Sequence, residues 1–168
     1  MDLVEVHDKQ EERQHVLTAF QIIFAQSQGL VDFPTRELID LITEIGELFP
    51  FDTAFEKTFE AVLAVAQERD GQATAGRMLL RRGTQLLEQH QPYEAIRTLG
   101  RAQQRLALRE CRGEFVTALA LCARAYEAAG LLWAAHASML LATSQALRDF
   151  WEDGTVTKQA YACLRRLP

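Results

Sequence analysis

Histidine and cysteine are the residue types in this chain that could bind a metal ion or act as a nucleophile. The sequence holds four histidines and three cysteines, namely His7, His15, His90, His136, Cys111, Cys122 and Cys163. Their spacing matches no zinc-binding motif, and no base stands beside a cysteine to activate it. We therefore expect the cysteines to be small core residues, although Cys111 falls at a predicted helix end, where a thiol can be exposed.

Phosphate-binding and serine-nucleophile motifs are also missing. Gly71, Gly76 and Gly83 have neither the spacing nor the preceding strand of a phosphate-binding loop. None of the serines lies in a context typical of a catalytic triad. The sequence thus predicts no catalytic, cofactor-binding or metal residues, and a protein that is not an enzyme.

Charged side chains at helical spacing are the remaining candidates. An acidic row, with steps of three and four residues, consists of Glu37, Asp40, Glu44 and Glu47. An arginine ridge, with steps of four residues, consists of Arg97, Arg101, Arg105 and Arg109, with Arg112 just beyond it. Like charges at these steps repel by a few tenths of a kcal/mol per pair. Each row therefore needs an oppositely charged neighbour or partner.

The composition suits a protein with one helical core. The chain has 168 residues, of which 48% are apolar and 24% charged, with only 9 glycines and 4 prolines. Such scarcity of turn residues argues against a β-sandwich. No apolar run approaches the roughly 18 residues of a membrane helix, no secretory leader is evident, and three cysteines form no disulfide framework. We expect a cytoplasmic protein without membrane contact.

The net charge of −5 conceals an asymmetry between the two parts of the chain. Residues 1–70 hold 15 acidic and 5 basic residues, whereas residues 71–168 hold 8 acidic and 13 basic residues. The two parts can pair with each other, pair with a neighbouring molecule, or present two kinds of surface. The overall acidity makes nonspecific nucleic-acid binding by the whole chain an unfavoured function.

The elements that would position these residues are helices throughout. Apolar residues recur at steps of three and four, and no stretch alternates as a strand would. Short breaks contain Gly or Pro, with Asp52 as an expected N-cap. The predicted helices span 4–27, 34–48, 52–69, 72–89, 92–111, 113–129, 131–149 and 155–166. The short loops between them make consecutive helices antiparallel neighbours.

A repeat of about 40 residues runs through the C-terminal part of the chain. The clearest copies are 75–110 and 115–150, and the repeated positions form matching pairs. The pairs are Ala95 and Ala135, Leu99 and Met139, Ala102 and Ala142, and Val116 and Val156. Each copy holds two amphipathic helices, which cannot bury their apolar faces alone. The units are therefore expected to stack.

These residues resemble the tetratricopeptide repeat, which has a large residue, Leu-Gly and Tyr on one helix and Ala-x-x-x-Phe on the next. The first copy has Leu79, Arg82, Gly83, Leu86, Ala95 and Leu99 at these positions. The second has Leu119, Cys122, Ala123, Tyr126, Ala135 and Met139, with Gly130 at the turn. The long period suggests the lengthened members of the family. The resemblance implies a single all-α domain over 1–168, a right-handed solenoid of about eight helices in antiparallel hairpins.

In that family the first helices of successive hairpins line a concave groove that binds protein or peptide. The resemblance places a basic face in this groove, made of Arg77, Arg81, Thr84, Thr117, Arg124 and Tyr161. The acidic row would lie on the same side of the solenoid. Either the acidic row and the basic face pair internally, or the basic face binds an acidic peptide or a C-terminal carboxylate.

The arginine ridge is expected to be a solvated convex face. The alternatives are that the ridge contacts an acidic protein or a nucleic acid. Binding of single-stranded nucleic acid usually needs aromatic residues that stack on bases, and the ridge helix has only Tyr93, in its first turn.

The function expected from these patterns is a non-catalytic scaffold that binds a protein or peptide. The main alternative is a sensor arm that forms part of a larger bacterial signalling ATPase. A weaker alternative, supported by the ridge alone, is an RNA-binding helical array. Apolar residues at both ends of the array, Phe20 to Phe24 and the lone last helix, further predict a fragment of a longer chain or a homodimer through an exposed end.

Overall fold

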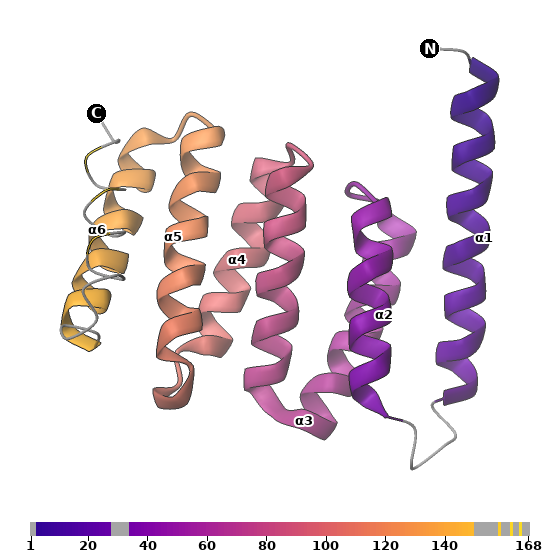
Figure 1. The fold of residues 1–168 in the computed structure, drawn as a ribbon, viewed down its shortest axis with the longest axis horizontal. Helices are drawn as coiled ribbons and strands as arrows, with labels where there is room; N and C mark the ends of the chain where they lie inside the picture. Colours follow the sequence, from indigo (N-terminus) through magenta and orange to yellow (C-terminus); the bar gives the residue numbers. More distant parts are fainter. Residues whose placement is uncertain (1–2, 28–33, 150–157, 159–161, 163–164, 166–168) are drawn as a thin grey trace. The chain divides into compact units, whose positions relative to one another are not determined.

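A computed structural model of the chain describes residues 3–27 and 34–149, together with positions 158, 162 and 165 (Figure 1). Their regular secondary structure is helical, with no strand among the described residues, as the sequence predicts. The elements are α1 (Leu3–Ser27), α2 (Thr35–Leu48), α3 (Thr53–Glu88), α4 (Pro92–Leu106), the 3₁₀ helix η1 (Arg109–Cys111), α5 (Arg112–Ala128) and α6 (Leu132–Asp149).

The described residues hold six α-helices where the sequence predicts eight over the whole chain. The predicted helix over 155–166 lies largely outside the described residues. The predicted helices over 52–69 and 72–89 are covered by α3, which loses helical geometry at Gly71, with φ 86° and ψ 179°. A positive φ suits glycine, which has no Cβ to clash. Gly71 is also where the chain divides into two compact units, 1–70 and 71–168.

The core of the 1–70 unit is rich in aromatic and aliphatic side chains. The rings of Phe49 and Phe55 stack with centroids 5.2 Å apart, and Phe59 follows Phe55 at 6.2 Å. Phe20 of α1 is buried, and Ile42 of α2 is completely inaccessible to solvent. This burial is what the helical spacing of apolar residues predicts.

The beginning of α3 is fixed by a side-chain cap. The carboxylate oxygen Oδ1 of Asp52 accepts hydrogen bonds from the backbone N–H groups of Ala54 and Phe55, both at 2.9 Å. The cap satisfies two donors that a helix start otherwise leaves without partners. The predicted N-cap role of Asp52 is confirmed.

In the 71–168 unit, glycines on the second segment of α3 (72–88) allow α4 to approach closely. A Cβ built on Gly83 would lie 2.6 Å from the side chain of Leu99, and one built on Gly76 would lie 2.8 Å from Leu106. Both leucines are completely buried. The glycine in the sequence pair Arg82-Gly83 is therefore needed for space on the helix surface, and neither glycine has a positive φ.

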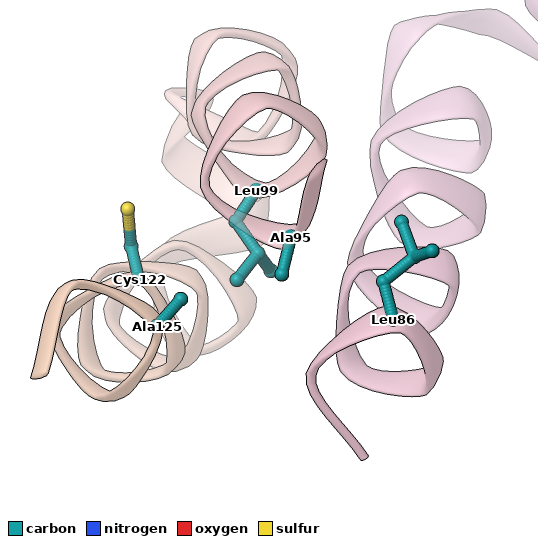
Figure 2. Packing of buried hydrophobic residues seen from close by; sticks show 5 residues of the cluster. All are labelled: Leu86, Ala95, Leu99, Cys122 and Ala125. Atoms are coloured by element: carbon teal, nitrogen blue, oxygen red, sulfur yellow. The ribbon is translucent and has the colours of Figure 1, made fainter. Parts of the chain in front are cut away.

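The next layer of packing joins α4 to α5. Figure 2 shows Leu99 and Ala95 of α4 lying between Leu86 of α3 and the pair Cys122 and Ala125 of α5. All five residues are buried. Farther along, α5 packs against α6, where Leu119, Ala123, Met139 and Ala142 form a second buried cluster. Three of the paired repeat positions, Ala95 and Ala135, Leu99 and Met139, and Ala102 and Ala142, are thus buried in both hairpins. Val116 is partly buried, and Val156 lies outside the described residues.

The turn from α3 to α4 ends the helix with two backbone hydrogen bonds. The N–H of Gln91 donates to the carbonyl of Leu86 at 2.8 Å, and the N–H of His90 donates to that of Leu87 at 3.2 Å. This arrangement is a Schellman motif, which requires a left-handed residue after the helix. His90 is that residue, with φ 59°.

The turn from α5 to α6 repeats this geometry 40 residues later. The N–H of Leu131 donates to the carbonyl of Tyr126 at 2.8 Å, and the N–H of Gly130 donates to that of Glu127 at 2.9 Å. Gly130 is the left-handed residue here, with φ 75°. The two hairpins therefore share the same turn, in which the second helix begins two residues after the left-handed residue.

The predicted helix over 92–111 is wrong at its end, because α4 stops at Leu106. Leu108 is extended, with φ −108° and ψ 151°, and η1 follows it. Leu106 and Cys111 are both completely buried. Residues five apart on one helix point about 140° away from each other. The break therefore lets both side chains face the core.

Substitution of Gly83 by alanine tests the close approach of α3 and α4. Alanine gains about 1 kcal/mol over glycine in a helix, but overpacking against Leu99 costs about 1–3 kcal/mol. Gly100 of α4, which has open space at its Cβ position, is the matched control. We expect Gly83→Ala to be less stable than Gly100→Ala by about 1–3 kcal/mol in urea denaturation. Equal stability of the two variants would contradict the packing described.

Substitution of His90 by glycine tests the strained turn. A left-handed conformation costs an ordinary residue about 1–2 kcal/mol. We expect His90→Gly to raise the free energy of unfolding by about 1 kcal/mol, and Gly130→Ala to lower it by about as much. Thermal and urea denaturation measure both changes, and a His90→Gly variant that is less stable than the parent would refute the turn assignment.

Candidate functional site

The basic face predicted for the groove is divided between two helices. Arg77, Arg81 and Thr84 lie on the second segment of α3, and Thr117 and Arg124 lie on α5. All are exposed except Thr84, which is half-buried. At the repeat offset of 40 residues, which the two hairpin turns share, Arg77 corresponds to Thr117 and Thr84 to Arg124. Tyr161, the last predicted member, lies outside the described residues.

An ion pair joins the two helices of the basic face. Arg77 Nε donates to Glu114 Oε1 of α5 at 3.1 Å, with 51% and 34% of the two side chains exposed. An exposed pair of this kind contributes about 0.2–1 kcal/mol. The contact places the second segment of α3 beside α5, which are the first helices of the two hairpins. It also neutralises the charge of Arg77. Sequence reasoning missed Glu114 because the two residues are far apart in the chain.

The threonine hydroxyl groups of the basic face donate hydrogen bonds within their own helices. Thr84 Oγ1 donates to the carbonyl of Leu80 at 2.9 Å, and Thr117 Oγ1 donates to that of Gly113 at 3.0 Å. Each hydroxyl oxygen can still accept a hydrogen bond but has no second proton to donate. Apart from Arg77, the other exposed members of this face are Arg81 and Arg124, whose guanidinium groups each carry several N–H donors.

All four members of the acidic row are exposed on α2. Arg36 Nε lies 4.0 Å from Asp40 Oδ2, a loose pair on the surface of the same helix. The acidic row belongs to the 1–70 unit and the basic face to the 71–168 unit. The pairing expected between them stays a prediction.

The arginine ridge is not the continuous solvated face that the sequence predicts. Arg97 is exposed and pairs with Glu94 through Nη1 and Oε2 at 2.9 Å. Arg101 and Arg105, in contrast, are only half-exposed. Arg109 leaves the row because α4 ends before it. Arg101 and Arg105 therefore lie on a side of α4 that other parts of the fold partly cover.

A cluster of charged groups that the sequence analysis did not single out gathers where η1, α5 and α6 meet. Arg148 Nε and Nη2 donate to Asp149 Oδ1 and Oδ2 at 3.1 and 3.4 Å, and Arg112 Nη1 lies 3.5 Å from Oδ1. The hydrogen bonds from Arg148, and then the charge of Arg112, lower the pKa of the Asp149 carboxyl. Arg109 lines the same hollow as Arg112, Arg148 and Asp149, and we call these four residues the arginine cluster.

The sequence did contain a signal for this cluster. The segment Ala107 to Glu110 returns 39 residues later as Ala146 to Asp149, with arginine at the third position of both copies. Only the fold shows that the two copies end beside each other, because the turn after α4 brings Arg109 back toward the end of α6.

Both described cysteines are buried. Cys111 lies near a helix end, where the sequence allows an exposed thiol, but it has no exposed surface, and Cys122 exposes only 3%. Burial is the main cause that raises the pKa of each thiol. In the described part of the chain, no group of three or more His, Cys, Asp or Glu side chains is arranged to hold a metal ion.

Several large apolar side chains are exposed at the start of α6. Trp133 exposes 90% of its surface, and Leu131 and Leu132 beside it are also exposed. The signal is visible in the sequence, since three consecutive large apolar residues cannot all lie on the narrow stripe that Ala135 and Met139 define.

Comparison with protein-family models, with curated proteins and with solved structures finds no match to this chain. None of the described helices combines the length and apolar character needed to cross a lipid bilayer.

Thiol reactivity tests the burial of the cysteines. In a Cys163→Ser background, we expect Ellman's reagent at pH 8 to react with Cys111 and Cys122 at least about tenfold more slowly in the folded protein than in urea. Burial hinders access and keeps both thiols protonated. The single variants Cys111→Ser and Cys122→Ser assign each rate, and rapid labelling of either thiol in the folded protein would contradict its buried position.

Proposed function

We propose that this chain is a non-catalytic scaffold, a right-handed solenoid of helix hairpins similar to tetratricopeptide repeats, that binds an acidic segment of a partner protein. The observation that supports this proposal best is the adjacency of the second segment of α3 and α5. The pair between Arg77 and Glu114 joins them, and Arg81 and Arg124 are exposed on them.

Two further features support the stacked arrangement. The hairpin turns at His90 and Gly130 have the same hydrogen bonds, and three pairs of repeated apolar positions are buried in both copies: Ala95 and Ala135, Leu99 and Met139, and Ala102 and Ala142. Hairpins with matching internal geometry stack into a superhelix, in which the first helices line one side. A peptide lying along that side would meet Arg81 and Arg124 in turn.

The alternatives differ in how much the described residues favour them. A sensor arm of a larger signalling ATPase would use the same binding face, so the same charge reversals would test it. The RNA-binding array depends on the arginine ridge, in which Arg101 and Arg105 are half-buried and Arg109 is off the helix. Protein binding is therefore the function that we propose.

Charge reversal on the basic face tests this function. Peptides selected from a random displayed library on the immobilised full chain should be rich in Asp and Glu. We expect their affinity to fall at least about fivefold in Arg124→Glu and in Arg81→Glu, since a carboxylate would then meet a like charge. Affinity should also fall as salt rises from about 0.05 to 0.3 M.

Arg97→Glu is the matched control, because Arg97 is an exposed arginine on α4, outside the basic face. It should leave the affinity unchanged. Selection of neutral or basic peptides, or an equal effect of all three reversals, would refute a specific acidic-peptide site on these helices.

A further inference from the structure

The arginine cluster borders a cavity of about 320 Å³ at the junction of α4, η1, α5 and α6. Its charged lining consists of Arg109, Arg112, Arg148 and Asp149, all in the 71–168 unit. This cavity is separate from the proposed basic face, and a ligand could occupy it whether or not the basic face binds an acidic peptide.

The cavity carries more positive than negative charge. Three guanidinium groups face one carboxylate, and Asp149 exposes only 7% of its side chain. Arg148 holds both oxygens of Asp149, while Arg112 makes only the looser contact at 3.5 Å. Arg109 is exposed and forms no ion pair within the described ranges. Donors of Arg109 and Arg112 are thus left to meet an incoming anion.

The backbone adds to this positive potential. The first turn of α5 begins at Arg112, and no side chain caps it. A helix of 17 residues presents N–H groups and the positive end of its dipole at this point. Glu114 in the same turn is already paired with Arg77. An anion beside Arg112 would be stabilised by the guanidinium groups and by the helix end together.

Apolar side chains also line the cavity. Leu106, Leu108 and Phe115 contribute to the lining, and the volume is at the small end of ligand pockets. Planar guanidinium groups match the two oxygens of a carboxylate or phosphate. We propose that this cavity binds a small organic oxyanion, a carboxylate or phosphate on an apolar body, with Arg109 and Arg112 holding the oxyanion and Phe115 and Leu108 contacting the body.

Asp149 has a defined role in this site. Arg148 donates to both of its oxygens, and Arg112 lies 3.5 Å from one of them, so Asp149 competes with an external anion for Arg112. Removal of its charge should therefore strengthen anion binding. A merely structural carboxylate would not do so, because its loss would loosen the site.

Binding can be measured on the full chain by calorimetry and by the NMR signals of the arginine Nε–H groups. The probes are phenyl phosphate, benzoate, inorganic phosphate and benzyl alcohol, at about 0.02 M salt to limit screening. Phenyl phosphate and benzoate should bind and shift the signals of Arg109 and Arg112. Benzyl alcohol, which has no charge, should not, and inorganic phosphate should bind more weakly than phenyl phosphate because it lacks the apolar body.

Substitutions then separate the proposed roles. Arg109→Gln and Arg112→Gln should each weaken the binding of phenyl phosphate about two- to fivefold. Asp149→Asn should tighten it by a similar factor. Arg97→Gln, on exposed α4 surface, should leave it unchanged.

The Arg109→Gln variant keeps the test decisive if Asp149→Asn fails to fold, because Arg109 has no ion pair to lose within the described residues. The proposal is overturned if neither charged aromatic probe binds, or if Arg109→Gln and Arg97→Gln have the same effect. It is also overturned if a folded Asp149→Asn variant, checked by circular dichroism, binds phenyl phosphate more weakly than the parent.

Discussion

The packing in the 71–168 unit depends on the absence of side chains at Gly83 and Gly76. Leu99 and Leu106 of α4 fill the space where a Cβ would otherwise stand. Because protein interiors are close-packed, leucines can lie this near to the facing helix only where that helix carries no side chain. In the next hairpin Ala123 and Met139 take the corresponding positions, and both are buried. Each hairpin thus solves the same packing problem with one small and one large residue.

This close packing decides where the charged groups lie. With α4 held against α3, its buried face extends to Leu106, and the chain must then turn so that Cys111 is buried as well. The turn forms η1 and brings Arg109 and Arg112 to the start of α5, beside Arg148 and Asp149 of α6. A requirement of the apolar core therefore assembles a charged cavity at the surface.

Internal ion pairs and helix hydrogen bonds restrict which polar groups can act on a partner. Arg77 is held by Glu114, and Arg97 by Glu94. The hydroxyl protons of Thr84 and Thr117 are used within their own helices. A long row of charged residues at helical spacing therefore overstates the binding surface, and the internal contacts of each group are the more selective guide to function.

The sequence by itself determined most helix limits, the cap at Asp52, the interruption at Gly71 and the buried stripe of each hairpin. These features depend on local physics, such as capping geometry, the conformational range of glycine and the spacing of apolar residues. It also suggested the basic face, although the partner of Arg77 could not be read from it. Only the tertiary structure decided the end of α4, the burial of Cys111 and the assembly of the arginine cluster. Each of these features depends on contacts between residues that are distant in the chain. A hydrophobic pattern specifies which side of a helix is buried, but it does not specify which distant residue packs against that side.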